Sequence, residues 1–246
     1  MKIALIGYGK MGKAIEEEIQ RLAETSPKKN APTVVTIFDE HNAKDLTPKY
    51  LQRADVAIEF TTPHTAYNNI LKCFEAGIPV VCGTTGWTDK LPELQKICKK
   101  QKQALFYASN FSIGVNLFFE VNRKLAKLMN KHPQYEVSLH EIHHTEKKDA
   151  PSGTAIVLAN DIVKKIKRKE KWVNKKTKVA AQLEVLSYRE KDVPGIHIVN
   201  YDSEFDSIQI QHSAHSRRGF ALGAIQAALW LKGKTGYFDM KDMLEL

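Results

Sequence analysis

Short apolar runs alternate with amphipathic segments over the first half of the chain. Residues Lys2–Ile6 form an apolar run of the kind found in strands that are buried on both faces. The spacing of Ile15, Ile19 and Leu22 then predicts a helix. The alternation continues with predicted strands at 33–38, 55–60, 79–82 and 104–107 and predicted helices at 65–75 and 91–100. Strands that alternate with helices predict a parallel, doubly wound sheet with right-handed crossovers.

The pattern changes after about Gly114. Helices are predicted at 116–129 and 152–167, and strands at 135–142, 183–189, 195–201 and 206–213. Consecutive strands with short links, such as the turn at Val193-Pro-Gly195, predict a mixed or antiparallel sheet that helices cover on one face. A final helix at 219–231 is rich in alanine and leucine and can pack back on the first sheet.

A glycine pattern, Gly7-x-Gly9-x-x-Gly12, follows the first strand and opens the first helix. There the first glycine permits a tight turn, the second lets the backbone approach a pyrophosphate, and the third lets helix and strand pack closely. We therefore expect dinucleotide binding and an α/β fold. It would combine a Rossmann-type parallel sheet domain of residues 1–114 and 218–246 with a second α+β domain of residues 115–217 that has a mixed or antiparallel sheet.

Asp39 ends the second predicted strand, where its carboxylate can accept hydrogen bonds from the adenosine ribose hydroxyls. That interaction favours NADH, and no arginine follows Asp39 to hold the extra phosphate of NADPH. Lys10 and Lys13 could still meet that phosphate, so both cofactors remain open. The competing interpretation of Asp39 is a turn-forming residue at a strand end.

Three further loops lie at the carboxyl ends of predicted strands, where open α/β sheets bind ligands. They span residues 60–63, 83–86 and 109–114 and are rich in glycine and small hydroxyl residues. Such residues suit close contact with a ribose and a nicotinamide ring, and ordinary turn chemistry is the alternative for each loop.

The stretch from Glu141 to Ala155 carries the strongest chemical signal. It places His143 beside His144, adds a cation at Lys147, and then opens a helix at Ser152. The first N–H groups of a helix have no partner within it and bind anions. We therefore expect a proton-donating histidine beside a binding site for a substrate carboxylate.

The same stretch contains a zinc-peptidase pattern, His140-Glu-Ile-His-His144. That motif requires a helix, on which the two outer histidines share a face. The residues before it alternate like a strand, which would set His140 and His144 roughly 13 Å apart at about 3.3 Å per residue. One zinc ion binds each nitrogen at about 2.0–2.1 Å, so we expect no metal here.

The net charge of +9 is concentrated in one segment. Residues Lys164–Lys178 contain nine lysines and arginines and one glutamate, which accounts for eight of the nine net positive charges. A solvated surface is the favoured interpretation and a polyanion-binding patch the alternative, so a nucleic-acid partner is disfavoured.

The three cysteines, Cys73, Cys82 and Cys98, are odd in number and form no C-x-x-C pair. They fit a reducing, cytoplasmic compartment and buried, inert thiols. No apolar run approaches the roughly 20 residues that cross a bilayer. The N-terminus enters a strand at once, so neither a membrane span nor a signal peptide is expected.

These motifs together resemble the dihydrodipicolinate reductases (4-hydroxy-tetrahydrodipicolinate reductases) of diaminopimelate and lysine biosynthesis. The resemblance spans essentially the whole chain. It is carried by Glu141, His143, His144, Lys147, Asp149, Pro151-Ser-Gly-Thr-Ala155, the Gly83-Thr-Thr-Gly86 loop, the loop at 108–115, the segment 212–224 and Phe238-Asp-Met240. The family implies reduction of a cyclic dicarboxylate with NADH or NADPH and loss of water, and a homotetramer assembled through the substrate domain.

The resemblance also implies roles for individual residues. His143 would donate the proton with Lys147 as its cationic partner. The substrate carboxylates would be held by His144, Lys147, Gly153 and Thr154. The adenosine half of the cofactor would be held by Gly7, Gly9, Lys10, Met11, Gly12 and Asp39. The nicotinamide half would be contacted by Phe60, Thr61, Gly83, Thr84, Thr85, Ser109, Asn110 and Phe111. Two departures from the family are the compact glycine turn and the missing arginine after Asp39.

Two alternatives stay open. The first is another Rossmann dehydrogenase of amino-acid metabolism, acting on a substrate such as aspartate or homoserine. The second is a dinucleotide-sensing regulator without turnover, which would use the Lys164–Lys178 segment as a polyanion-binding patch.

Overall fold

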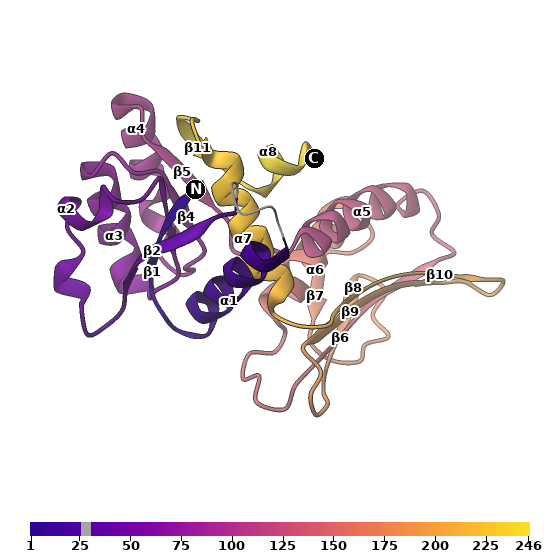
Figure 1. The fold of residues 1–246 in the computed structure, drawn as a ribbon. Helices are drawn as coiled ribbons and strands as arrows, with labels where there is room; N and C mark the ends of the chain where they lie inside the picture. Colours follow the sequence, from indigo (N-terminus) through magenta and orange to yellow (C-terminus); the bar gives the residue numbers. More distant parts are fainter. Residues whose placement is uncertain (26–30) are drawn as a thin grey trace. The chain divides into compact units, whose positions relative to one another are not determined.

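The computed structural model describes residues 1–25 and 31–246. The chain divides into two compact units (Figure 1). The first unit consists of residues 1–113 and 217–246, and the second of residues 114–216. No helix in these described residues is long and apolar enough to cross a membrane.

The first unit contains a six-stranded sheet in the order β11-β5-β4-β3-β1-β2. All its strand pairs are parallel, as the alternation of apolar runs and helices predicts. The strands are β1 Lys2–Ile6, β2 Thr33–Phe38, β3 Val56–Glu59, β4 Val80–Cys82, β5 Ala104–Tyr107 and β11 Gly236–Phe238. The predicted fold class is confirmed for this unit.

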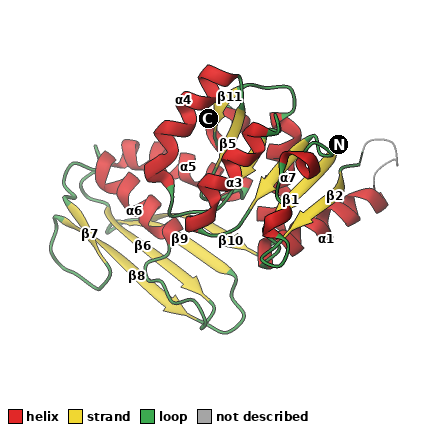
Figure 2. Cartoon of the chain, turned by 90° about the vertical axis from the view of Figure 1, so that its left-hand side faces the viewer, coloured by secondary structure: helices red, strands yellow, loops and turns green. Residues whose placement is uncertain are grey.

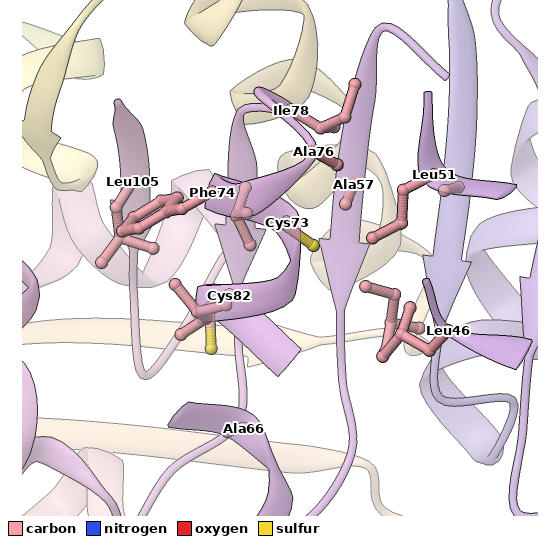
Figure 3. Packing of buried hydrophobic residues seen from close by; sticks show 14 of the residues in the cluster. Leu46, Leu51, Ala57, Ala66, Cys73, Phe74, Ala76, Ile78, Cys82 and Leu105 are labelled. Carbon is pink, nitrogen blue, oxygen red and sulfur yellow. The ribbon is translucent and has the colours of Figure 1, made fainter. Parts of the chain in front are cut away.

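Helices cover both faces of this sheet because successive strand residues point to opposite sides. On one face, α3 and α4 pack on Ala4, Ala57 and Leu105 (Figure 3). On the other, α1 and α7 pack on Leu5 and Ile58. The helices are α1 Lys10–Thr25, α2 Pro48–Leu51, α3 Pro63–Glu75, α4 Leu91–Gln101, α7 Arg218–Leu231 and α8 Met240–Leu244, with 3₁₀ turns at Ala43–Asp45 and Thr88–Lys90.

Helix α7 returns from the second unit to the first sheet, as its alanine-rich sequence predicts. Gly223 lets it approach closely, because a Cβ there would lie 1.8 Å from the carbonyl oxygen of Phe111. At its start, Arg218 Nε donates to the buried Glu18 of α1 at 2.8 Å. The C-terminal segment is therefore an integral layer of the first unit.

The second unit contains a five-stranded mixed sheet in the order β10-β9-β6-β8-β7. β6 is antiparallel to β9 and parallel to β8, so the predicted mixed sheet is confirmed. Helices α5 and α6 lie over one face of this sheet (Figure 2). Their apolar side chains pack on that face. The elements are α5 Ile113–Met129, β6 Glu136–His143, α6 Gly153–Lys165, β7 Lys171–Val173, β8 Gln182–Arg189, β9 Gly195–Asp202 and β10 Ser207–Ala214.

The lysine-rich segment differs from its interpretation as a solvated surface. Lys169 is only 2 % exposed. Its ammonium group pairs with Glu136 and donates to the carbonyl oxygens of Ala180 and Gln182 at 2.8 and 3.0 Å. Arg168 donates to two further carbonyl oxygens, at residues 129 and 135. Arg168 and Lys169 therefore hold together the beginnings of strands β6 and β8. The interpretation as a solvated surface was wrong for these two residues.

The thiols are buried and unpaired, as predicted. Burial raises the pKa of Cys98 to about 11 and also raises the pKa values of Cys73 and Cys82. Because the thiolate is the reactive form, these cysteines are inert at neutral pH.

Candidate active site

The glycine turn joins β1 to α1 in the first unit. Gly7 has a φ of +94°, and a Cβ on it would lie 2.0 Å from the carbonyl oxygen of Phe60. A Cβ on Gly12 would lie 2.3 Å from the carbonyl oxygen of Gly7. Gly9 has nothing within 4 Å of its Cβ position. Two of the glycines are thus required by the turn itself, and the middle one leaves open space where a pyrophosphate can approach.

A cavity of about 610 Å³ opens beside this turn. Of the residues predicted to bind the cofactor, those that line it are Gly7, Gly9, Asp39, Phe60 and Thr61. Lys13 also lines it, whereas Lys10, Met11 and Gly12 do not. Lys13 is therefore the better placed of the two lysines considered for a 2′-phosphate.

Asp39 combines the two interpretations offered for it. Its Oδ1 accepts backbone hydrogen bonds from His41 at 2.8 Å and Asn42 at 3.2 Å, which is turn chemistry. Asn42 closes the turn by accepting from the backbone N–H of Asp39 at 2.7 Å. The residue also lines the cavity. The Oδ1 atom of Asp39 thus holds the turn, and the residue lies at the cavity wall.

The three loops at the sheet edge are in contact with one another. A Cβ on Gly83 would lie 2.1 Å from the ring of Phe60, and that ring lies 5.7 Å from the ring of Phe111. The backbone N–H of Thr61 donates to Thr84 Oγ1 at 2.7 Å. The structure therefore brings together Phe60, Thr61, Gly83, Thr84 and Phe111.

Not all of these loop residues are available to a ligand. Phe111 and Thr84 are buried, and Thr85 and Ser109 are exposed. Asn110 uses its side-chain oxygen to accept from the backbone of Ser112 at 2.8 Å. The buried pair therefore shapes the loops, and the exposed pair leaves its side chains open to solvent.

Sequence reasoning missed Glu59, a fully buried carboxylate that ends β3. It accepts hydrogen bonds from Thr61, from Asn69 at 3.4 Å and from Cys82 Sγ at 3.0 Å. The residue sits inside an apolar strand pattern, so only its polarity within a buried run could have signalled it. Its contacts fix the loop that follows β3 beside the cavity.

In the second unit, strand β6 presents Glu141 and His143 on its buried face. Neighbouring β9 contributes His197, which lies opposite Glu141 in the sheet register. Glu141 Oε2 lies 3.5 Å from His143 Nδ1 and 3.6 Å from His197 Nε2. The two imidazole rings meet edge to face, with centroids 5.1 Å apart. Three titratable side chains thus share one buried pocket of the second unit.

Glu141 is fully buried and saturated with donors. Its oxygens accept from the Ser152 backbone N–H at 3.0 and 3.1 Å and from Ser187 Oγ at 2.8 Å. Burial alone would raise the pKa of Glu141, but its interactions with His197, Ser152 and Ser187 outweigh burial and lower that pKa to about 2. Glu141 is therefore a permanent anion in this pocket.

His143 is 6 % exposed. Burial and the nearby His197, Lys147 and Arg189 together lower the pKa of His143 to about 4, against the opposing effect of Glu141. The imidazole is therefore neutral at pH 7.

Lys147 and Asp149 form an ion pair in the loop after β6. Lys147 Nζ lies 2.8 Å from Asp149 Oδ1. Arg189, at the end of β8, donates to the carbonyl oxygens of Lys147 at 3.1 Å and Asp149 at 2.6 Å, which fastens the loop. The ammonium group of Lys147 is thus held near His143 by a partner that is itself more than half exposed.

Helix α6 begins where the sequence predicts, with Ser152 as its N-cap. Ser152 Oγ accepts from the Ala155 backbone N–H at 3.2 Å. A Cβ on Gly153 would meet nothing within 4 Å, and Thr154 is half-buried. The N–H groups of Gly153 and Thr154 are among those that the helix leaves unpaired, so they can receive an anion. His144 is half-buried just after the end of β6.

The zinc-peptidase pattern lies on a strand, as predicted. His140 to His143 belong to β6, and His140 packs on the opposite side against the ring of Tyr188 at 6.0 Å. The side chains that do gather are Glu141, His143 and His197, whose candidate ligand atoms lie within 4.8 Å of one another. Sequence reasoning missed His197, Ser187 and Arg189, because strand pairing is not visible in the sequence.

The fold and these sites define a class of protein. A parallel sheet with a glycine turn and a ligand cavity at its carboxyl edge is typical of NAD(P)-dependent oxidoreductases, and the second unit adds a histidine pocket beside a helix N-terminus.

Family models narrow this class. The model of the dihydrodipicolinate reductase N-terminus matches residues 1–111, and that of the dihydrodipicolinate reductase C-terminus matches residues 114–244. The chain belongs to the dihydrodipicolinate reductase family.

Individual relatives agree with this assignment. A 4-hydroxy-tetrahydrodipicolinate reductase of Christiangramia forsetii is 46% identical over 99% of this chain and 98% of its own length. One of Neisseria gonorrhoeae is 30% identical over 100% of this chain and 98% of its own length. A solved structure of dipicolinate-bound dihydrodipicolinate reductase from Paenisporosarcina covers 99% of both chains with a TM-score of 0.73. It is 22% identical and supports the fold alone.

Proposed function

We propose that this protein reduces 4-hydroxy-tetrahydrodipicolinate to tetrahydrodipicolinate with NADH or NADPH, in the diaminopimelate route to lysine. The observation that carries the proposal is the 46% identity to a 4-hydroxy-tetrahydrodipicolinate reductase over nearly the full length of both chains. The reaction consumes one hydride and one proton and releases one water.

The residues of the first unit fit a dinucleotide. Open space at Gly9, the carboxylate of Asp39 and the cavity beside them match the adenosine half. We assign Gly7, Gly9, Lys10, Met11, Gly12 and Asp39 to that half, and Phe60, Thr61, Gly83, Thr84, Thr85, Ser109, Asn110 and Phe111 to the nicotinamide half. When bound, the cofactor supplies the hydride. Residues 1–114 and 218–246 would then form the dinucleotide-binding domain.

The second unit, residues 115–217, would bind the substrate. Hydride addition to a conjugated imine leaves electron density at the far end of the conjugated system, and His143 would donate the proton that quenches it. Lys147, His144 and the N–H groups of Gly153 and Thr154 would hold the two carboxylates. In the ligand-free structure Lys147 is paired with Asp149, so a substrate carboxylate would compete with that exposed partner.

The same unit would assemble the homotetramer. On the sheet face away from its apolar core, Ile142 lies in register with Tyr188 and Ile196, and His140 with Leu186 and Ile198. Within the unit no described helix contributes to a core on that face, and Tyr188 is 43 % exposed. A second copy would bury these apolar side chains. The buried thiols fit a reducing compartment, and we propose a cytoplasmic location.

A coupled assay tests the activity. Dihydrodipicolinate synthase generates the substrate, and cofactor oxidation is followed at the absorbance of reduced nicotinamide. We expect oxidation that depends on the coupling enzyme, and a loss of kcat of about 10²–10⁴-fold in His143→Ala. Absence of oxidation with both cofactors would refute the activity. Full kcat in His143→Ala together with Lys147→Ala would refute the residue roles.

A further inference from the structure

A row of polar side chains crosses the second sheet on its buried face. Ser187 of β8, Glu141 of β6, His197 of β9 and His212 of β10 lie opposite one another in register. His143, the proposed proton donor, stands two residues beyond Glu141 on the same face. The polar row therefore lies at the edge of the apolar core of the second unit, next to the proposed proton donor.

Two imidazoles compete for one carboxylate oxygen in this row. Oε2 of Glu141 lies 3.5 Å from His143 Nδ1 and 3.6 Å from His197 Nε2. The Nδ1 atoms of both histidines are buried without a hydrogen-bond partner among the described residues. A proton on one ring disfavours a proton on the other, because like charges 5.1 Å apart in a buried pocket repel.

The geometry also fixes which nitrogen of His143 can meet a substrate. Nδ1 is the ring nitrogen on the side of the Glu141 carboxylate, 3.5 Å from its Oε2. Nε2 faces Gly195, where a Cβ would lie only 3.0 Å away. Room for the working nitrogen therefore depends on the missing side chain of Gly195.

His197 is in turn connected to the proposed carboxylate site. Its Nε2 lies 3.1 Å from Ser152 Oγ, the N-cap of α6. The backbone N–H of Ser152 donates to Glu141. Hydrogen bonds thus connect Ser152 at the start of α6 with both Glu141 and His197, and His143 Nδ1 lies 3.5 Å from the same carboxylate.

We propose that Glu141 and His197 are positioning residues that act with His143 as one buried proton-donating unit, in which Glu141 orients the His143 ring and His197 sets the pH range over which His143 carries its proton. The inference rests on the proposed function of His143 and deepens it. After donation from Nε2 to the substrate carbon, His143 is neutral and takes its next proton from solvent.

The charges around His143 disfavour a proton on both imidazoles at the same time. The groups that face it are Glu141, His197, Lys147 and Arg189, and only the first is an anion. His212 adds a further imidazole against His197. The same charges disfavour a metal ion between Glu141, His143 and His197. The cationic Arg189 Nη1 lies 3.9 Å from Glu141. The carboxylate oxygens of Glu141 already accept hydrogen bonds from Ser152 and Ser187.

The test compares pH profiles of kcat. His197→Gln keeps a polar group beside Ser152 but removes the competing cation, so the alkaline limb of kcat moves to higher pH by on the order of one unit. Glu141→Gln removes the anion, so the limb moves to lower pH and kcat falls by roughly 10²-fold. KM for the substrate changes little in either variant. His132→Gln, an exposed histidine of the same unit, is the matched control and leaves the profile unchanged.

A second measurement does not depend on turnover. Imidazole NMR of the free protein follows the pKa of His143, which we expect to rise from about 4 in His197→Gln. If His197→Gln fails to fold, His197→Asn takes its place in both measurements, because asparagine also removes the competing imidazole and keeps a polar side chain.

The outcomes separate the two proposals. Full kcat in His143→Ala would refute the proton-donor role itself. Loss of kcat in His143→Ala with superimposable pH profiles for wild type and His197→Gln would overturn only the coupling. Stoichiometric zinc in the purified protein would also overturn it, because the three side chains would then be metal ligands.

Discussion

At the scale of single residues, the site combines local rules with long-range pairing. The glycine turn and the N-cap at Ser152 follow from local sequence, and the structure has both. Asp39 shows both features, because its turn contacts are with neighbouring residues whereas the cavity that it lines is formed by segments far apart in the sequence. The two uses of Asp39 can be separated by substitution.

Replacing Asp39 with asparagine should change cofactor preference. Asparagine keeps an oxygen that can accept from His41 and Asn42, but it loses the negative charge that we propose to face the ribose. We expect kcat/KM for NADH to fall about tenfold, because a charged hydrogen bond contributes about 1.5–3 kcal/mol and a neutral one about half of that. The value for NADPH should stay the same or rise. Steady-state assays with both cofactors measure the ratio.

The matched control for this prediction is Asp45→Asn. Asp45 lies in the 3₁₀ turn that follows Asp39 and does not line the cavity. Equal losses for NADH and NADPH in Asp39→Asn, or the same change of ratio in the control, would contradict a ribose contact.

The buried histidine also makes stability depend on pH. The pKa of His143 is about 4 in the folded protein, because of its burial, and about 6.5 in the unfolded chain. Between these values the unfolded chain binds a proton that the folded chain does not, so the free energy of unfolding falls as the pH drops. Glu141, with a pKa of about 2 against its ordinary 4.5, adds a second loss below pH 4.5.

Urea unfolding at pH 7 and pH 5 measures this effect. We expect wild type to lose roughly 2 kcal/mol more than His143→Gln between the two pH values, because glutamine does not titrate. Equal losses in the two proteins would show that His143 is not neutral in the folded state at pH 5.

The residues of the second unit that the sequence did not reveal were missed for one reason. His197 lies on a strand that the alternation predicts, but its position opposite Glu141 depends on the register between β6 and β9. Ser187 and Arg189 reach the site through the pairing of β6 with β8. Alternation places a residue on a face, whereas register decides which residues of two strands meet.

At the scale of elements, the segments that take part in the alternation of strands and helices were predictable, including the three-residue strand β4, whereas short elements outside that alternation were not. The alternation of strands and helices gave the parallel sheet, and Thr33–Phe38 is a strand over its whole predicted range. Strands β7 and β11 have three residues each and α8 has five, too few for any periodicity to show. Helix α7 was predicted from composition, and its fit depends on one glycine.

Gly223→Ala should separate α7 from the loop that follows β5. The added methyl group would lie 1.8 Å from the backbone oxygen of Phe111, which cannot move as a flexible side chain can. We expect a loss of about 3 kcal/mol in the free energy of unfolding. Gly219→Ala in the same helix is the control, since its Cβ would meet nothing within 4 Å and alanine favours a helix. A neutral Gly223→Ala in urea unfolding would refute this packing.

At the scale of the whole molecule, charge and apolar surface have different consequences. Arg168 and Lys169 of the basic segment are engaged inside the second unit, which leaves less of the net charge for a partner. On the outer face of the second sheet, Tyr188 is 43 % exposed and lies in register with Ile142, which lies in register with Ile196. We therefore expect the sheet face, more than the basic segment, to contact a partner, and we expect that partner to be a second copy of the chain.

The oligomer gives the final prediction. Light scattering coupled to gel filtration should report the mass of four chains for the wild-type protein. Ile198→Glu places a charge in the middle of the outer sheet face, in register with His140, and should release smaller species because a buried unpaired carboxylate costs several kcal/mol. Glu184→Gln, near the β7 end of the same sheet, is the control. A wild-type mass of one chain would refute the homotetramer. An Ile198→Glu protein that keeps the wild-type mass would show that the interface does not lie on this sheet face.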